Sequence, residues 1–181
     1  TAEREVKAMC DLVRDETERI DSRFLEPACG DGNFLAEILS RKLSSVRKKY
    51  GKSPSDYEKN AVLAASSIYG VDILQDNVIA CRERMFGIWD KEYSAVCKKD
   101  CNDETRKAVR FIFSRNIVCG NALTLMCVDE NGKDISAPIV FSEWSFVTGN
   151  NIQRCDYTFA ELLADVRRAP GQRSMFDADY E

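Results

Sequence analysis

The residues best suited to chemistry lie in one short stretch, residues 24–35, which reads F-L-E-P-A-C-G-D-G-N-F-L. Its first two residues are typical of a buried strand, and Pro27 ends the strand because proline has no N–H to donate. Gly30 and Gly32 permit positive φ and let a ligand approach the backbone closely. A helix beginning near Phe34 would present free N–H groups in its first turn. The stretch therefore predicts a strand–turn–helix corner at the carboxyl end of a sheet, where open α/β sheets bind ligands.

The sequence of this turn excludes two common nucleotide-binding sites. A dinucleotide fingerprint, G-x-G-x-x-G, needs a third glycine where this chain has Leu35. A P-loop needs Gly-Lys-Ser/Thr, which this turn lacks. An acid, Glu26, followed by a proline and a two-glycine turn favours a ligand with an amino-acid end and a nucleoside but no phosphate.

Two further predicted strands bring polar side chains to the same edge. Residues 68–72 form an apolar run that ends in Asp72, and residues 116–119 form a strand followed shortly by Asn121 and Ala122. A carboxylate accepts two hydrogen bonds side by side, so Asp72 is suited to bind both hydroxyl groups of a ribose. Helical patterns separate the strands, which predicts an α/β sandwich.

Apolar spacing and turn signals predict the other elements. Residues 1–20 read as one helix, and the capping box Ser55-x-x-Glu58 predicts the start of another. Residues 130–133, Glu-Asn-Gly-Lys, are typical of a hairpin turn. The apolar run 138–141 is expected to be the fourth strand of the sheet.

Composition limits the class of protein. The chain has 181 residues, 44% hydrophobic and 31% charged, as in one globular domain. No apolar run approaches the roughly 18 residues of a membrane span, so we expect a cytoplasmic protein without a membrane partner. Eight cysteines without a C-x-x-C pair, and no histidine, argue against a zinc site and remove the commonest general base. The net charge of the chain is −4, whereas most nucleic-acid-binding proteins carry a positively charged face.

The motif E-P-A-C-G-D-G-N-F resembles the first motif of S-adenosylmethionine-dependent methyltransferases. Its residues look most like those of the adenine-N6 DNA methyltransferases of restriction–modification systems. Asp72 and the pair Asn121-Ala122 resemble the second and third motifs, in the right order. The resemblance implies a doubly wound, Rossmann-like class I methyltransferase sheet with helices on both faces. It implies one domain over residues 1–169, followed by a polar tail at 170–181.

The resemblance implies S-adenosylmethionine as the cofactor, with Asp72 on its ribose and Ile73 over its adenine. In the family, a segment that begins with threonine lies over the methionine end, and Thr1 matches that residue. The third motif usually reads Gly-Asp-Ala, and its acid receives the adenine amino group. Asn121 stands at that position here, and its amide oxygen can still accept the bond. The implied cofactor-binding residues are Thr1, Glu26, Ala28, Gly30, Gly32, Phe34, Asp72, Ile73, Asn121 and Ala122.

The catalytic tetrapeptide of adenine methyltransferases, Asn/Asp-Pro-Pro-Tyr/Phe, does not occur in the sequence. In the family it ends the fourth strand, where its first residue accepts from the target amino group and its aromatic ring stacks on the flipped base. This chain has Glu143 and Trp144 at the matching place. In one interpretation Glu143 accepts a hydrogen bond and Trp144 stacks on the base; in the other, both residues merely continue a strand.

Three functional hypotheses remain open. The first is an adenine-N6 DNA methyltransferase-like protein that reaches DNA through a specificity subunit or a missing recognition domain. The second is a non-catalytic cofactor-binding or partner subunit, favoured by the missing tetrapeptide, by Asn121 and by the acidic balance. The third is methylation of a small molecule or a protein. The position of Glu143 and Trp144 relative to the glycine turn discriminates between the first two.

Overall fold

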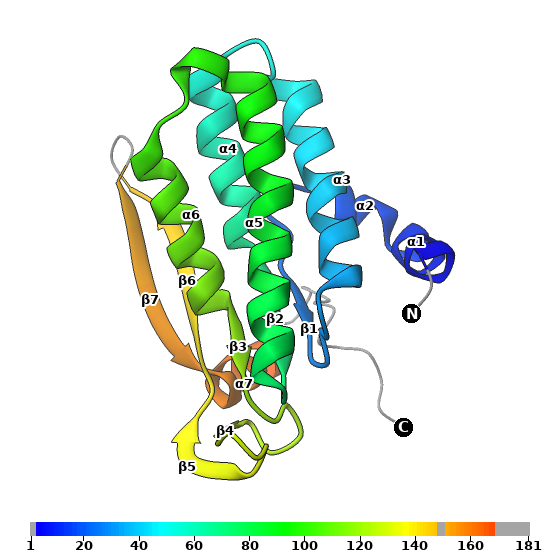
Figure 1. Ribbon diagram of the computed structural model, residues 1–181, viewed down its shortest axis with the longest axis vertical. Helices are drawn as coiled ribbons and strands as arrows, with labels where there is room; N and C mark the ends of the chain where they lie inside the picture. The colour runs from blue at the N-terminus through cyan, green and yellow to red at the C-terminus, as the bar shows by residue number, and fades with distance from the viewer. Residues whose placement is uncertain (1–2, 148–150, 169–181) are drawn as a thin grey trace.

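The computed structural model describes residues 3–147 and 151–168. Its elements follow the order α1 (Glu3–Leu12), α2 (Arg14–Glu18), β1 (Phe24–Glu26), α3 (Asn33–Tyr50), α4 (Pro54–Ser66), β2 (Ile68–Asp72), α5 (Gln75–Cys97), η1 (Lys98–Asp100), α6 (Asp103–Asn116), β3 (Ile117–Cys119), β4 (Met126–Val128), β5 (Asp134–Pro138), β6 (Val140–Phe146), β7 (Ile152–Thr158) and α7 (Phe159–Arg168). Strands and helices alternate through β3, so the predicted mixed α/β class is confirmed. Two antiparallel strand pairs then follow (Figure 1).

A three-stranded parallel sheet, in the order β1–β2–β3, lies at the centre of the fold. Successive side chains in a strand point to opposite faces, so each strand contributes to two separate cores. The residues facing the first core are Phe24, Ile68 and Ile117, and those facing the second are Leu25, Tyr69 and Val71. Because the strands are parallel, the segments that follow them meet at one edge, the carboxyl end of the sheet.

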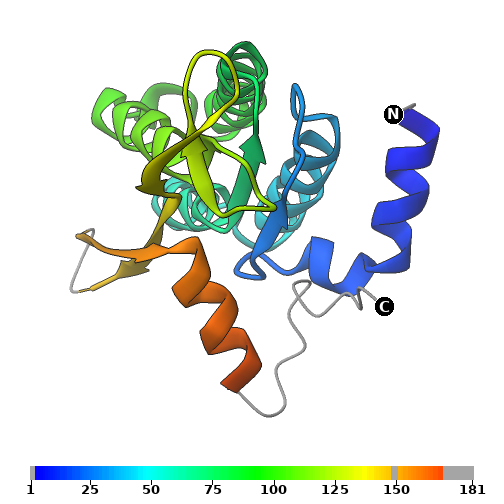
Figure 2. The same cartoon turned by 90° about the horizontal axis from the view of Figure 1, so that it is seen from below.

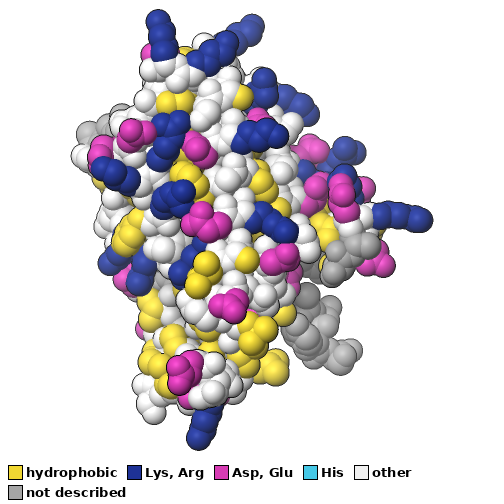
Figure 3. Space-filling view, in the orientation of Figure 1, with side chains coloured by type: hydrophobic (Ala, Val, Ile, Leu, Met, Phe, Trp, Pro, Cys, Tyr) yellow, Lys and Arg dark blue, Asp and Glu magenta, His cyan; other side chains and the backbone are white. Residues whose placement is uncertain are grey.

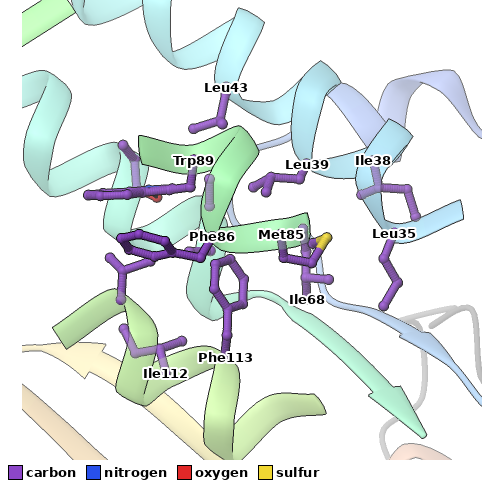
Figure 4. Packing of buried hydrophobic residues seen from close by; sticks show 14 of the residues in the cluster. Leu35, Ile38, Leu39, Leu43, Ile68, Met85, Phe86, Trp89, Ile112 and Phe113 are labelled. Carbon is purple, nitrogen blue, oxygen red and sulfur yellow. Dashed lines mark hydrogen bonds between the residues drawn. The ribbon is translucent and has the colours of Figure 1, made fainter. Parts of the chain in front are cut away.

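Four long helices, α3 to α6, stand together on one face of this sheet (Figures 1 and 2). Their apolar faces form the larger core, which buries Ile38, Leu39 and Leu43 of α3 and Val109, Ile112 and Phe113 of α6. Trp89 of α5 lies at its centre, stacked on Tyr93 with ring centroids 4.7 Å apart, and its indole N–H donates to the Ala61 carbonyl (2.9 Å). Figure 4 shows Leu35, Ile38 and Leu39 of α3 facing Met85 of α5, with Ile112 and Phe113 of α6 below Phe86.

The opposite face is covered by the start of β6 and the start of α7 (Figure 2), whereas Trp144 and Phe146 near the end of β6 and Ile152 of β7 pack against the larger core. Phe141 packs edge-on against both Tyr69 and Phe159, with centroid separations of 5.4 and 5.3 Å. The Tyr69 hydroxyl donates to the Ser142 carbonyl (2.8 Å). The run 138–141 therefore packs against the sheet face, and its pairing partner is β7, antiparallel. The prediction that it forms a fourth strand of the sheet is wrong.

A buried lysine secures the segment that leads into β1. Lys42 of α3 is fully buried, and its Nζ donates to the carbonyls of Arg19 (2.6 Å), Ile20 (3.1 Å) and Ser22 (2.6 Å). Burial lowers the pKa of Lys42 to about 7, against partial compensation by Asp21. The three carbonyls match the three N–H groups of an ammonium, so Lys42 holds residues 19–22 against α3 through hydrogen bonds.

A buried amide joins four elements at the amino end of the sheet. Asn116, at the end of α6, is fully buried and donates through Nδ2 to the carbonyls of Ser66 (3.1 Å) and Ile68 (3.2 Å). Its Oδ1 accepts from the indole N–H of Trp144 (2.9 Å). Both donors and the acceptor of the Asn116 amide are thus used, as expected of a buried polar side chain.

The helices predicted over residues 1–20 and from Ser55 and the predicted hairpin occur in the structure, with differences at the ends of the helices. The helix expected over residues 1–20 is interrupted at Val13, which separates α1 from α2. The helix expected to start at Ser55 begins instead at Pro54, because Ser53 is its N-cap and accepts from the Asp56 N–H (3.4 Å). The hairpin predicted at residues 130–133 connects β4 with β5. The tail assigned to residues 170–181 lies outside the described residues.

Among the described helices, none has both the length and the apolar character needed to cross a membrane.

Candidate functional site at the carboxyl end of the sheet

The glycine turn between β1 and α3 has the predicted strand–turn–helix geometry. Gly30 and Gly32 have φ values of +53° and +89°, in the left-handed region that favours glycine. The Cys29 N–H donates to the Val71 carbonyl (2.9 Å), which fixes the turn against β2. At Gly32 a Cβ atom would lie 2.6 Å from the sulfur of Cys81, so that position needs glycine for space as well as for conformation.

Asp72, at the end of β2, lies directly against this turn. Its Oδ2 accepts the backbone N–H of Gly30 (2.9 Å). Its Oδ1 accepts the Leu74 N–H (2.9 Å) and the side-chain amide of Asn77 (3.1 Å). The first two predicted motifs, 42 residues apart in sequence, therefore meet as expected.

These bonds limit what Asp72 can still accept. A carboxylate has about four acceptor positions, and three are used in this structure. Oδ2 retains one of them, whereas Oδ1 already has two donors. Binding both hydroxyl groups of a ribose therefore requires the Asn77 amide to move away from Oδ1.

Glu26 ends β1 on the other side of the turn and is partly buried. Burial raises the pKa of its carboxyl group above the usual value, and the Ala28 N–H, which donates to it, opposes that shift. A cation bound beside Glu26 would favour the ionised carboxylate again. The side chain thus has the character expected of a partner for an ammonium group.

An arginine that the sequence analysis did not identify clamps the outer side of the turn. Arg84 of α5 donates through Nη1 to Asn33 Oδ1 (2.5 Å) and through Nη2 to Asp31 Oδ2 (2.9 Å). Its planar guanidinium is suited to such a two-pronged contact. No signal within the motif indicates this residue, because it lies 53 positions after Asp31 and reaches the turn only through helix packing.

Asn121 follows β3 at the same edge, but its amide is engaged locally. Its Oδ1 accepts the Leu123 N–H (3.0 Å), and its Nδ2 donates to Asp134 (3.2 Å). The first of these bonds is a typical Asx turn. The oxygen expected to receive an adenine amino group therefore already has one donor, and Ala122 lies inside the same turn.

Exposed apolar side chains surround this edge of the sheet. Figure 3 shows hydrophobic atoms gathered at the lower end of the molecule, where β4 and β5 lie. The exposed side chains there are Ile73, Leu74, Leu123, Met126 and Ile135. Ile73, expected to cover an adenine ring, is 43% exposed beside Asp72. Phe34, in contrast, is only partly exposed and packs against the larger core.

Glu143 and Trp144 lie at the opposite end of the strands. Glu143 forms an ion pair with Arg23, just before β1, and Trp144 donates to Asn116, just before β3. The indole also packs edge-on against Phe111 at 5.9 Å. The reason is the direction of β6, which runs from the carboxyl end of the sheet, at Ile139, to the amino end.

The structure thus brings together Glu26, Ala28, the two glycines, Asp72, Ile73, Asn121 and Ala122, and it separates Glu143 and Trp144 from them. Of the other two predicted cofactor residues, Phe34 packs against the larger core and Thr1 lies outside the described residues. Comparison of the chain with family models, with curated proteins and with solved structures finds no match. Its function is therefore inferred from the site itself.

Proposed function

We propose that this chain binds S-adenosylmethionine at the carboxyl end of β1, β2 and β3, as the cofactor-binding part of an adenine-N6 DNA methyltransferase-like protein. The observation that carries the proposal is the hydrogen bond from Gly30 N–H to Asp72 Oδ2. It joins a left-handed two-glycine turn to an acid at the end of the neighbouring parallel strand, the arrangement that binds nucleosides in open α/β sheets.

The chemistry of the edge matches the parts of this ligand. Glu26 offers an acceptor to an amino-acid ammonium, Asp72 offers acceptors to a ribose, and the exposed Ile73 offers apolar surface to an adenine. Arg84 reaches the glycine turn in the structure, but its guanidinium is paired with Asp31 and Asn33 and is not free to bind a phosphate. A phosphate-free nucleoside therefore fits better than a nucleotide.

The position of Glu143 and Trp144 favours a cofactor-binding role over complete catalysis by these residues. An accepting group and a stacking ring have to lie beside the transferred methyl group to act on an adenine. Both residues are instead paired at the amino end of the sheet. We propose that the target adenine is held by a partner subunit that also contacts DNA.

Calorimetric titration with S-adenosylmethionine tests the proposal. Wild-type protein is expected to bind with a micromolar dissociation constant, and Asp72→Asn to bind at least tenfold more weakly, about 1.4 kcal/mol. Asp100→Asn, in η1 far from the turn, is the matched control and should bind like wild type. Absence of binding by folded wild-type protein would contradict the proposal.

A second variant separates the ligand role of Asp72 from its structural role. Asn77→Ala removes one donor from Oδ1 and leaves the Gly30 and Leu74 bonds in place. If the ribose uses Oδ1, this variant should bind at least as tightly as wild type. Weaker binding by Asn77→Ala would show that the amide itself contacts the ligand.

A further inference from the structure

One long edge of the β6–β7 pair has no partner strand among the described residues. The pair forms a sheet of its own, and Figure 1 shows β7 along the left margin of the molecule. On the other side of the pair, β6 lies against the parallel sheet, where the Ser142 carbonyl accepts from the Tyr69 hydroxyl (2.8 Å). β7 is a strand of seven residues, I-Q-R-C-D-Y-T, without proline. An open edge of this length is a template for pairing with another strand.

The hydrogen bonds within the pair show which residues of β7 face the open edge. The Phe159 N–H donates to the Ile139 carbonyl (2.8 Å), and the Val147 N–H donates to the Asn151 carbonyl (3.0 Å). Both bonds join odd-numbered residues in the continuous register of the hairpin. Bonded and non-bonded pairs alternate along an antiparallel ladder. The even-numbered residues of β7 therefore direct their N–H and C=O groups outward, away from β6.

Two opposite charges flank the centre of this open edge. Cys155 is the middle residue of β7, with Arg154 before it and Asp156 after it, and all three are exposed. Arg154 Nε lies 3.2 Å from Asp156 Oδ1, so the two charged side chains lie on the same face of the hairpin. When two copies of this strand pair antiparallel about Cys155, Arg154 of each copy lies opposite Asp156 of the other. The edge is therefore complementary to itself.

We propose that the chain forms a two-fold symmetric dimer in which β7 pairs antiparallel with β7 of a second copy, centred on Cys155. Arg154 and Asp156 of the other copy then exchange both backbone hydrogen bonds, and their side chains form an ion pair. A register centred on Arg154 or on Asp156 would place like charges directly opposite each other, which is destabilising. Charge thus selects one register. Pairing of one strand buries less than the roughly 1,200 Å² of a stable interface, so the dimer is weak and depends on concentration.

Sedimentation velocity on the reduced protein tests the association. Wild type is expected to shift from monomer to dimer as its concentration rises, with a dissociation constant on the order of 100 μM. Arg154→Asp and Asp156→Arg should each remain monomeric, because each gives the edge a single sign of charge. An equimolar mixture of the two variants has complementary edges and should form a heterodimer. Lys52→Asp, at an exposed position after α3, should dimerise like wild type. Wild type that stays monomeric up to about 500 μM, or folded variants that do not associate when mixed, would overturn the proposal.

Cys155 reports the register directly, without a change of charge. In the proposed dimer it lies opposite Cys155 of the other copy in a non-bonded pair with Cα atoms about 4.5 Å apart, within the range of a disulfide. Diamide, which accepts two electrons and two protons from each pair of thiols, should therefore link two chains through this residue, as shown by mass spectrometry of the unreduced digest. Cys155→Ser should abolish the link.

A matched variant separates this register from random collision. Gln153→Cys in the Cys155→Ser protein places an exposed thiol on the same face, two residues earlier in β7. In the proposed register it lies opposite Tyr157 and about 14 Å from its own copy, beyond the reach of a disulfide. We expect diamide to link this variant at least tenfold more slowly than wild type. Equal rates of linking would show that the thiols meet by collision and would overturn the proposed register.

Discussion

The two ends of the parallel sheet differ in how their polar groups are used. At the amino end, Asn116 and Lys42 are fully buried, and their donors meet carbonyl groups inside the protein. At the carboxyl end, Gly30 and Asp72 are partly exposed, and exposed apolar side chains such as Ile73 and Leu74 lie beside them. The amino end therefore stabilises the fold, whereas the carboxyl end is where we propose that the ligand binds. Substitutions at the two ends should separate stability from binding.

The largest effect on stability is expected from Asn116→Ala. It leaves the Ser66 and Ile68 carbonyls and the Trp144 indole N–H without their partner, and each unsatisfied buried group costs about 1–3 kcal/mol. We expect a loss of about 3–5 kcal/mol in the free energy of unfolding, measured by urea denaturation. Asn60→Ala, on an exposed face of α4, is the control and should change it by less than about 0.5 kcal/mol. Equal effects would remove the distinction between buried and exposed amides.

The second effect depends on pH. Lys42→Met removes the donor from three carbonyls and should cost about 2 kcal/mol at pH 7. The folded pKa of Lys42, about 7, lies below its unfolded value of 10.5, so the unfolded state binds more protons between these values. The stability of wild type relative to the variant should therefore rise with pH above 7, by at most about 1.4 kcal/mol per pH unit.

Unfolding curves of both proteins at pH 7, 8 and 9 measure this difference. Lys48 is an exposed lysine in the last turn of α3, so the free energy of unfolding of Lys48→Met should change with pH in the same way as that of wild type. If the free energy of unfolding of Lys42→Met also changes with pH as in wild type, the lowered pKa of the buried Lys42 is contradicted.

At the carboxyl end, Gly32→Ala should reduce both the stability of the protein and its binding of the ligand. The change places a Cβ against the Cys81 sulfur and forces an alanine into a left-handed conformation, at a cost of about 2 kcal/mol in stability. Gly30→Ala also forces an alanine into a left-handed conformation, but no atom lies within 4 Å of its Cβ position, so it should cost about 1 kcal/mol in stability. Adding Cys81→Ala should recover the difference between the two. If the double variant is no more stable than Gly32→Ala, the steric part of the account is wrong.

The smallest expected effect is a gain in stability. The buried Tyr57 hydroxyl has no hydrogen-bond partner among the described residues, so Tyr57→Phe should raise the free energy of unfolding by about 1 kcal/mol. Tyr93→Phe is the contrasting control, because the Tyr93 hydroxyl bonds to Glu58 and accepts the Asn102 N–H. That variant should be destabilised. Thermal unfolding compares the two, and a loss of stability in Tyr57→Phe would point to a partner for its hydroxyl.

The parts of the fold predicted from the sequence are those set by local patterns. The glycine turn, the strand ending at Asp72 and the hairpin between β4 and β5 follow from glycine spacing, apolar runs and turn residues. The direction of β6 was not predictable in this way, because it depends on packing against Tyr69 and pairing with β7. The expected place of Glu143 and Trp144 depended on that direction. The roles of Lys42 and Arg84 likewise arise from contacts between elements distant in sequence, which a single helical pattern does not reveal.

The central claim, that the carboxyl end binds the ligand and the amino end does not, is tested most directly by hydrogen–deuterium exchange with and without S-adenosylmethionine. We predict slower exchange at residues 29–33 and 72–77 when the ligand is present, and unchanged exchange at residues 142–145. Protection at residues 142–145 without protection at the glycine turn would contradict the account, because it would place the ligand at the end of the sheet that we assign to stability.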